Sequence, residues 1–345
     1  MVRKKRTIHK NLIMEEIMKK VLFVVLALAM LLSAVSVFAE NSIEGKVVAF
    51  IPKLTGNSFF EAANDGAQKY AKEWGIEVKY MGSAVASVTD QLEVIQQAID
   101  AGVDAIAISS VDATALDEKL QEARDMGIVV TTWDSDVSSN SRTLMVSQGM
   151  PSTLGPMLVD MGVESLKERG VDVDGAVKYV WHYSQAAVAD PYYSEQDPQK
   201  SVTIGEAILE AHPDVDLIIC NDSTALPGQC TAAENKGLKA EDITITGFCT
   251  PSGMTAHLEA GTLTRWGLWD CGIQGALGCY FGAYLAAGNE AKAGETINVP
   301  GIGDCEIVAN EALVPGDTTA DVNNGVVLLP ERVVFTAENV ANYNF

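Results

Sequence analysis

Four short β-rich runs open the folded part of the sequence: VVAFIPK (47–53), EVKYMG (77–82), DAIAISSV (104–111) and IVVTTWD (128–134). The stretches between them are amphipathic with a helical period, at 58–73, 88–101 and 113–126. Strands that alternate with helices in this way predict a parallel sheet covered by helices on both faces.

The same alternation continues and then starts again. A fifth run, TLMVSQG (143–149), precedes a long helical stretch at 151–170. The second series of runs is AVKYVWHYS (176–184), VDLIICND (215–222), ITITGFCT (243–250) and RWGLWD (265–270). Two series without a Pro/Gly-rich linker predict two doubly wound α/β lobes, between which the chain crosses several times. The late run GVVLLPERVVF (325–335) is interpreted as a strand that returns to the hinge.

These runs predict the division into lobes. Residues 40–149 and about 272–310 would form the first lobe, and residues 150–271 and about 311–345 the second lobe with the hinge return.

The second lobe is predicted to lack one helix–strand pair. In the first lobe, the first and third strands start 57 residues apart, at 47 and 104. The corresponding starts in the second lobe, 176 and 215, lie 39 residues apart and enclose one helical stretch at 198–211.

The composition limits the class of partner. The 345 residues are 48% apolar and 20% charged, which suits about two domains with sizeable cores and excludes a disordered chain. Residues 40–345 hold 44 acidic and 17 basic residues, a net charge of −27. Such a body repels phosphate backbones and anionic membrane surfaces, so nucleic acid is not expected as a partner.

Residues 1–39 have the features of a secretory signal peptide. Two lysines precede the apolar run VLFVVLALAMLLSAVSVF (21–38), and small residues stand before the expected cut after Ala39. A membrane anchor is the alternative, but the run is short for a span and its small-residue exit favours cleavage. No Cys follows to accept a lipid, and Met18 is a more natural start than Met1. The mature protein is therefore expected outside the cytoplasm, in the periplasm or its equivalent, and not to span the membrane.

The six cysteines all lie in the second half of the chain, at 220, 230, 249, 271, 279 and 305. No CxxC pair or Cys/His cluster occurs, so no metal site is expected. A Cys220–Cys249 disulfide is geometrically possible because both residues end successive predicted strands, but small buried thiols are favoured.

The candidate binding residues follow the β-rich runs, because ligands of open α/β sheets bind beyond the carboxyl ends of the strands. In the first series these residues are Lys53, Asn57, Phe59, Phe60 and Asp134. In the second series they are Asp190, Asn221, Ser223, Trp266, Trp269 and Asp270. Carboxylates and amides beside aromatic faces suit a small polyol, whose C–H faces stack on rings while its hydroxyls bridge the polar groups. Facing strand ends of two lobes would form a cleft that closes by hinge motion.

Some of these residues have a structural alternative. Phe59 and Phe60 could only cap the core, and Lys53 could merely pair with Asp134, which would still place it in the cleft. Asp222 could equally well cap the helix that begins with STALPGQ.

Catalytic motifs are absent from the sequence. The histidines beyond the leader are scattered singly, and no HExxH, GxSxG, Walker loop or GxGxxG after the first strand occurs. His182 lies inside an apolar run and is interpreted as a core residue. The sequence therefore predicts binding without catalysis and without a cofactor.

Six segments carry a family resemblance: IPKLTGNSFF, TWDSD, SQGMPSTLGPMLVDM, GFCTP, GLWD and NNGVVLLPERVVFTAEN. From about residue 46 to the C-terminus they resemble, in order, the periplasmic sugar-binding proteins of type I (ribose-binding-like). Within that family they are similar to the autoinducer-2-binding (Lsr-type)/rhamnose-binding branch of ABC transporter substrate-binding proteins. The resemblance implies two lobes joined by a multi-strand hinge. It also implies a receptor that delivers a small sugar or furanose-like ligand to an ABC permease.

Carried over by this resemblance, the family's ligand-binding lysine falls on Lys53 and its two aspartates fall on Asp134 and Asp190. The autoinducer-2 (AI-2) branch then expects Gln where this chain has Pro191. It also expects Pro and Ala where this chain has Asn221 and Ser223, whereas the ribose-like branch places Asn at the position of Asn221. The resemblance thus implies a mosaic pocket.

The sequence leads to an exported solute-binding receptor of an ABC importer that binds a small sugar or an AI-2-like furanose between its lobes. A sensory co-receptor for chemotaxis or quorum signalling, using the same cleft, is the alternative, and only its partner differs. A secreted sugar enzyme is the third hypothesis, and the shortage of catalytic motifs argues against it.

Overall fold

The computed structural model describes residues 40–183, 192–318 and 323–345. Within these residues, eight strands form one sheet in the order β10-β11-β12-β5-β4-β3-β1-β2. Their bounds are β1 (Val47–Ile51), β2 (Glu77–Tyr80), β3 (Ala105–Ile108), β4 (Val129–Trp133), β5 (Leu144–Ser147), β10 (Thr296–Val299), β11 (Gly303–Val308) and β12 (Gly325–Leu328). Strands β1 to β5 and β12 are parallel, and β11 is antiparallel to both of its neighbours.

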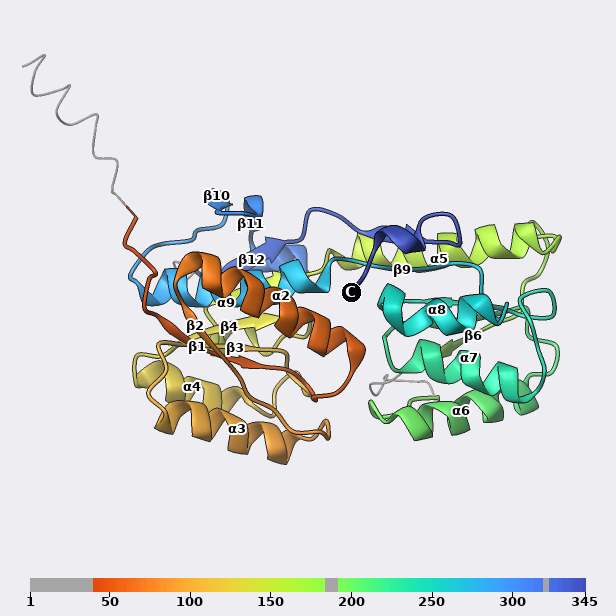
Figure 1. The fold of residues 1–345 in the computed structure, drawn as a ribbon, viewed down its shortest axis with the longest axis horizontal. Coiled ribbons are helices and arrows are strands. Elements are labelled where there is room, and N and C mark those ends of the chain that lie inside the picture. Colours follow the sequence, from red (N-terminus) through yellow and green to blue (C-terminus); the bar gives the residue numbers. More distant parts are fainter. Residues whose placement is uncertain (1–39, 184–191, 319–322) are drawn as a thin grey trace, which may run out of the picture. The chain divides into compact units, whose positions relative to one another are not determined.

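Helices cover both faces of this large sheet (Figure 1). Helices α2 (Ser58–Trp74) and α9 (Cys271–Ala286) lie on one face, and α3 (Val88–Asp100) and α4 (Asp117–Asp125) on the other. Because successive side chains of a strand point to opposite faces, Phe50 joins the core under α2 and α9 while Ile51 joins the core under α3 and α4. Burial on both faces explains why VVAFI is uninterruptedly apolar, as predicted.

A smaller parallel sheet has the order β6-β7-β8, with bounds β6 (Tyr179–His182), β7 (Leu217–Cys220) and β8 (Thr244–Gly247). Its helices are α5 (Pro151–Glu168), α6 (Pro198–Ala211), α7 (Ala225–Asn235) and α8 (Pro251–Glu259). Helix α5 lies on one side of this sheet and α6 and α7 on the other (Figure 1). Short 3₁₀ turns are η1 (Ser139–Ser141), η2 (Asn310–Ala312) and η3 (Val340–Asn342). The mixed α/β architecture with two helix-covered sheets matches the predicted fold class.

Strand β6 is an edge of the small sheet. Among the described residues between β6 and β7, α6 is the only helix. On the outer side of β6, the described residues form a single parallel bridge, between Tyr183 and Tyr193. Residues 184–191 lie outside the described residues, so the missing helix–strand pair stays a prediction.

The last third of the chain differs in two respects from the predicted division into lobes. The run 325–335 forms two strands, β12 and β13 (Val333–Phe335). Strand β12 belongs to the large sheet beside β5, although 311–345 was assigned to the second lobe. This buried parallel position accounts for the continuous apolar run of the strand. Strand β9 (Trp266–Leu268) pairs with β13, antiparallel, and its Gly267 forms an isolated parallel bridge with Phe248, the residue that follows β8.

Helices α2 and α9 approach each other through glycines. A Cβ atom added at Gly66 would lie 2.2 Å from the carbonyl oxygen of Gly272, and one added at Gly275 would lie 2.3 Å from that of Ala63. The two helix backbones are therefore in direct contact, which only residues without a side chain permit.

All six cysteines are buried free thiols, which confirms the preferred interpretation. His182 is fully buried as predicted, its Nδ1 lies 3.2 Å from Gln229 Oε1, and desolvation lowers its pKa. Desolvation raises the pKa of every cysteine, to about 12 for Cys249 and to about 11 for Cys305.

We expect the native thiols to be inert. At pH 8 the folded protein should consume less than about one equivalent of Ellman's reagent within minutes, because the reactive thiolate is scarce and covered. The protein unfolded in guanidinium chloride should consume six equivalents. Rapid reaction of the native protein, or fewer than six thiols after unfolding without reductant, would contradict the structure.

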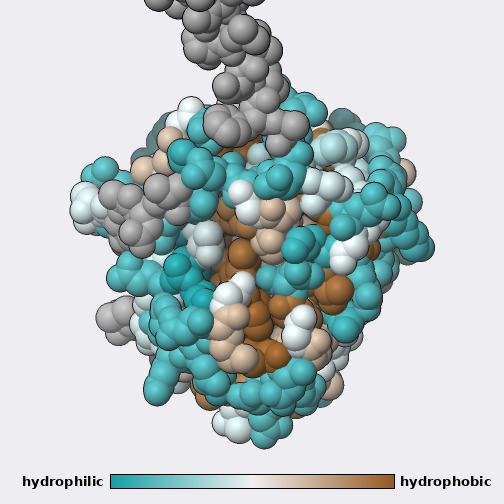
Figure 2. Space-filling model, turned by 90° about the vertical axis from the view of Figure 1, so that its left-hand side faces the viewer, coloured by the Kyte–Doolittle hydropathy of each residue, from teal (hydrophilic) through white to brown (hydrophobic). Residues whose placement is uncertain are grey.

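Figure 2 shows one end of the structure, where hydrophilic residues form a rim and apolar residues reach the surface at the centre. The large apolar side chains most exposed among the described residues are Val85, Met126, Val159, Tyr179 and Val314, which come from separate parts of the chain. In the part of the chain that the structure describes, no helix has the length and apolar character needed to cross a membrane.

Candidate functional site

A cavity of about 170 Å³ lies where the ends of strands from both sheets meet. It is lined by Lys53, Asn57, Phe59, Phe60, Asp134, Ser135, Gln148, Gln196, Asn221, Asp222, Ser223, Thr224, Phe248, Leu268 and Trp269. Residues 42–345 form one compact unit, so the cavity is part of a single folded body. Its volume is below the range of roughly 300–1,000 Å³ that is usual for drug-sized ligands, which indicates a small ligand.

A buried ion pair lies in the cavity wall. Lys53, just after β1, is 7% exposed, and its Nζ lies 3.1 Å from Oδ2 of Asp134, just after β4. Strands β1 and β4 flank β3, whose following residue Ser109 donates to the same Oδ2 at 2.8 Å. The carboxylate thus holds the lysine in place, and both groups keep polar atoms available to a ligand.

Asp134 has a left-handed backbone, with φ of +61°. The Ser135 amide donates to the Trp133 carbonyl at 2.7 Å, which makes residues 133–135 a γ-turn. A non-glycine residue in this conformation is strained and persists only when its surroundings hold it. Here Gln148 Nε2 donates to the Asp134 carbonyl at 3.2 Å, and the Ser110 amide donates to the Ser135 carbonyl at 3.1 Å.

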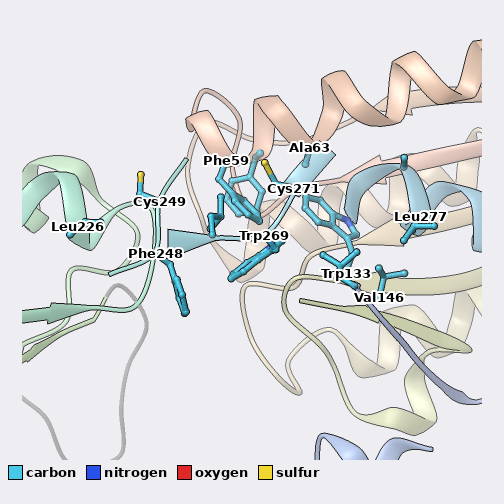
Figure 3. Close-up of a cluster of buried hydrophobic side chains, with 14 of the residues drawn as sticks. Phe59, Ala63, Trp133, Val146, Leu226, Phe248, Cys249, Trp269, Cys271 and Leu277 are labelled. Atoms are coloured by element: carbon cyan, nitrogen blue, oxygen red, sulfur yellow. The ribbon is translucent and has the colours of Figure 1, made fainter. Parts of the chain in front are cut away.

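Four aromatic rings and Leu268 form the apolar part of the wall. Phe59 packs edge to face against Phe60 and Trp269, with centroids 5.2 and 5.9 Å apart, and Phe248 lies 5.5 Å from Trp269. Figure 3 shows Phe59 and Trp269 beside Trp133, with Phe248 and Cys249 coming from the small-sheet side. The Trp269 indole donates to Gln274 Oε1 at 2.6 Å, which fixes the ring. Such rigid faces suit the C–H side of a sugar ring.

The segment after β7 supplies polar groups from the other sheet. Asn221 Oδ1 is buried and has no hydrogen-bond partner among the described residues. Asp222 Oδ1 accepts from the amides of Thr224 and Ala225 at 2.8 and 2.9 Å, so this carboxylate caps the first turn of α7 as well as lining the cavity. A buried acceptor without a partner costs stability, so a rearrangement of the wall that brings a donor to Asn221 Oδ1 is favourable.

Two hydrogen bonds join the large-sheet and small-sheet halves beside the cavity. Asn57, the N-cap of α2, donates to Thr224 Oγ1 at 3.4 Å, and Ser58 Oγ lies 2.9 Å from Thr250 Oγ1. These contacts hold the two walls together around the cavity.

We expect Ser58→Ala to weaken ligand binding about fivefold, because one neutral hydrogen bond between the halves is worth about 1 kcal/mol. Titration calorimetry measures this change, and Ser42→Ala, remote from the cavity in sequence and structure, serves as the control. Unchanged affinity in Ser58→Ala would mean that the Ser58–Thr250 hydrogen bond does not help to hold the two walls together around a ligand.

The structure brings most of the sequence-predicted site residues together. Those that line the cavity are Lys53, Asn57, Phe59, Phe60, Asp134, Asn221, Ser223 and Trp269. Asp190 lies outside the described residues.

Two predicted site residues lie away from the cavity. Trp266 is fully buried and packs on Phe335, 5.6 Å between centroids. It begins strand β9, whereas the cavity lies at the other end of this strand, beside Leu268 and Trp269. Asp270 is exposed, and its carboxylate accepts from the Ile273 amide as the N-cap of α9.

Seven wall residues are not in the list of candidate binding residues: Ser135, Gln148, Gln196, Asp222, Thr224, Phe248 and Leu268. Phe248 directly follows β8, but no candidate residue was taken from this strand end. Applying the strand-end rule to GFCT (247–250) would have pointed to it. Gln196 gave no sequence signal, since it comes from an irregular segment before α6.

Among the described residues, no group of three or more His, Cys, Asp or Glu side chains is placed to hold a metal ion.

The two helix-covered sheets and the polar and aromatic cavity at their strand ends define an α/β protein with the architecture of a binding protein. The sequence model of the family described as "Periplasmic binding protein domain" matches residues 48–180 and 172–290 of this chain. The chain belongs to this family of solute-binding proteins.

Among solved structures, the chain is similar to LsrB from Clostridium saccharobutylicum in complex with AI-2. The two share 51% identity with a TM-score of 0.84, over 87% of this chain and 100% of LsrB. A solute-binding protein of an ABC transporter from Clostridium phytofermentas, with bound L-rhamnose, shares 23% identity with a TM-score of 0.74, over 87% of this chain and 98% of that protein. That likeness shows the fold.

Curated relatives are ribose-binding proteins. The D-ribose/D-allose-binding protein of Pseudomonas aeruginosa is 25% identical over 62% of this chain and 74% of that protein. The ribose import binding protein RbsB of Bacillus subtilis is 24% identical over 67% of this chain and 81% of that protein.

Proposed function

We propose that the chain is the extracytoplasmic receptor of an ABC importer and that it binds AI-2 in the cavity around Lys53 and Asp134. Residues 1–39 would direct export, and a membrane permease would receive the ligand. The large-sheet and small-sheet halves would act as the two lobes, closing over the ligand by hinge motion.

One observation supports this proposal most strongly: the ion pair of Lys53 and Asp134 lines the same cavity as Asn221, whose side-chain oxygen has no hydrogen-bond partner among the described residues. Lysine donates, the aspartate and asparagine oxygens accept, and the aromatic rings cover an apolar face. A compact, neutral molecule with several hydroxyls satisfies all of these groups at once. A phosphorylated sugar does not, since Asp134 and Asp222 outnumber the single lysine and the body of the protein is strongly acidic.

The choice of AI-2 rests on the 51% identity to the AI-2 complex of LsrB. Lys53 and Asp134 stand where the resemblance places ligand-binding groups. Asn221 and Ser223 depart from the Pro and Ala of that branch and add hydrogen-bonding groups to the wall, so D-ribose is the main competitor.

A thermal-shift series with AI-2, L-rhamnose, D-ribose, D-xylose, D-galactose and D-glucose tests the proposal. A ligand at 100 times its Kd adds about 2.7 kcal/mol to stability, which raises Tm by roughly 4 °C for a chain of this size. We expect AI-2 to give the largest shift. A larger shift with D-ribose would make the protein a sugar receptor, and a cooperative melt that no compound shifts would refute the proposal.

A further inference from the structure

A buried arginine lies close to the strained turn that carries Asp134, outside the cavity wall. Arg142, just before β5, is 2% exposed. Its Nε lies 2.9 Å from Oδ1 of Asp136 and its Nη2 lies 2.8 Å from Oδ2, a two-point contact with one carboxylate. Its Nη1 donates to Asn324 Oδ1 and to the Gly325 carbonyl, both at 3.1 Å.

Asp136 is also bonded on the other side of the turn. Thr132, buried in β4, donates to Asp136 Oδ1 at 2.6 Å. Residues 132 and 136 are thus tied together across residue 134. The Thr132–Asp136 hydrogen bond thus spans the strained residue Asp134 from outside the cavity. Arg142 links Asp136 to Gly325, the first residue of β12.

We propose that Arg142, acting through Asp136, is a positioning residue that holds the Asp134 turn in its ligand-binding conformation. Without the guanidinium, Asp136 loses its charged partner and the turn loses the support that offsets its strain. The Asp134 carboxylate then spends less time in contact with Lys53. This inference rests on the proposed function for its affinity readout only.

The first readout is AI-2 affinity by titration calorimetry. We expect Arg142→Met to weaken binding at least tenfold and Arg142→Lys to recover only part of it, because an ammonium cannot make the two-point contact. Asp136→Asn should weaken binding similarly. The double variant should bind no more weakly than Arg142→Met alone, since the two residues act as one unit.

The second readout needs no ligand. Hydrogen exchange of the peptide that covers residues 130–140 should be faster in Arg142→Met than in the native protein, because the Ser135 amide is bonded within the turn. Arg169→Met is the matched control. Arg169 is 11% exposed and 3.7 Å from Asp216, but does not line the cavity, so its loss should change neither affinity nor this peptide's exchange.

The outcomes separate the two proposals. If the native protein binds no AI-2, the proposed function fails and the exchange readout alone decides the role of Arg142. The inference is overturned if hydrogen exchange of residues 130–140 in Arg142→Met is as slow as in the native protein. It is also overturned if Arg142→Met binds AI-2 with native affinity. Should Arg142→Met not fold, Arg142→Lys and Asp136→Asn carry the same tests.

Discussion

We expect Asp134→Asn to weaken AI-2 binding by about 100-fold or more and to destabilise the protein by about 3 kcal/mol. Asparagine keeps the size of the side chain and tolerates the left-handed backbone, so the change removes mainly the charge. It leaves the Lys53 ammonium, 7% exposed, without its counter-charge. An unpaired buried charge is the costly outcome of breaking such a pair.

A double variant separates stability from binding. Lys53→Met with Asp134→Asn removes both charges and should return the free energy of unfolding, measured in urea, to within about 1 kcal/mol of the native value. AI-2 binding should stay lost. The exposed pair Lys119–Glu122 supplies the control, because Glu122→Gln should cost less than about 1 kcal/mol. Native affinity in Asp134→Asn would remove Asp134 from the site.

Gly275→Ala is expected to destabilise the protein by about 3 kcal/mol or more. The new Cβ would lie 2.3 Å from the Ala63 carbonyl oxygen, and the obstacle is backbone, which cannot rotate away. Helices α2 and α9 must separate, and α9 also carries Gln274, the residue that fixes Trp269. Urea unfolding followed by circular dichroism measures the loss.

Gly278→Ala is the matched control for this substitution. Gly278 lies in the same helix α9, and a Cβ there would be 3.5 Å from its nearest neighbour, Trp133, which is an ordinary contact distance. Alanine at 278 should therefore change the free energy of unfolding by less than about 1 kcal/mol. Equal effects of the two substitutions would show that the α2–α9 contact is looser than described.

Most of the helices and strands could be predicted from the alternation of β-rich and helical stretches in the sequence. Stretches such as 198–211 and 58–73 were predicted nearly to the residue, because Pro198 and Asn57 mark helix starts in the sequence. The place of β12 in the large sheet was not predictable, since an apolar run does not state which sheet will bury it. The strand pairing depends on chain crossings that leave no local signal.

The site residues, too, were predicted from the sequence only in part. Lys53, Asp134 and Asn221 were found because strand ends of parallel sheets converge on one edge. Trp266 and Asp270 were misplaced because the rule selects a neighbourhood and not a side-chain direction. The role of Arg142 depends on contacts with residues 136 and 324, and the distance of 182 positions between Arg142 and Asn324 hides it from the sequence.

The most direct test of the central claim is a calorimetric titration of the purified protein with AI-2. We expect one molecule of AI-2 bound per chain, with the heat of binding abolished in Asp134→Asn. Absence of binding, or binding that survives in Asp134→Asn, would contradict the assignment of the cavity as the ligand site.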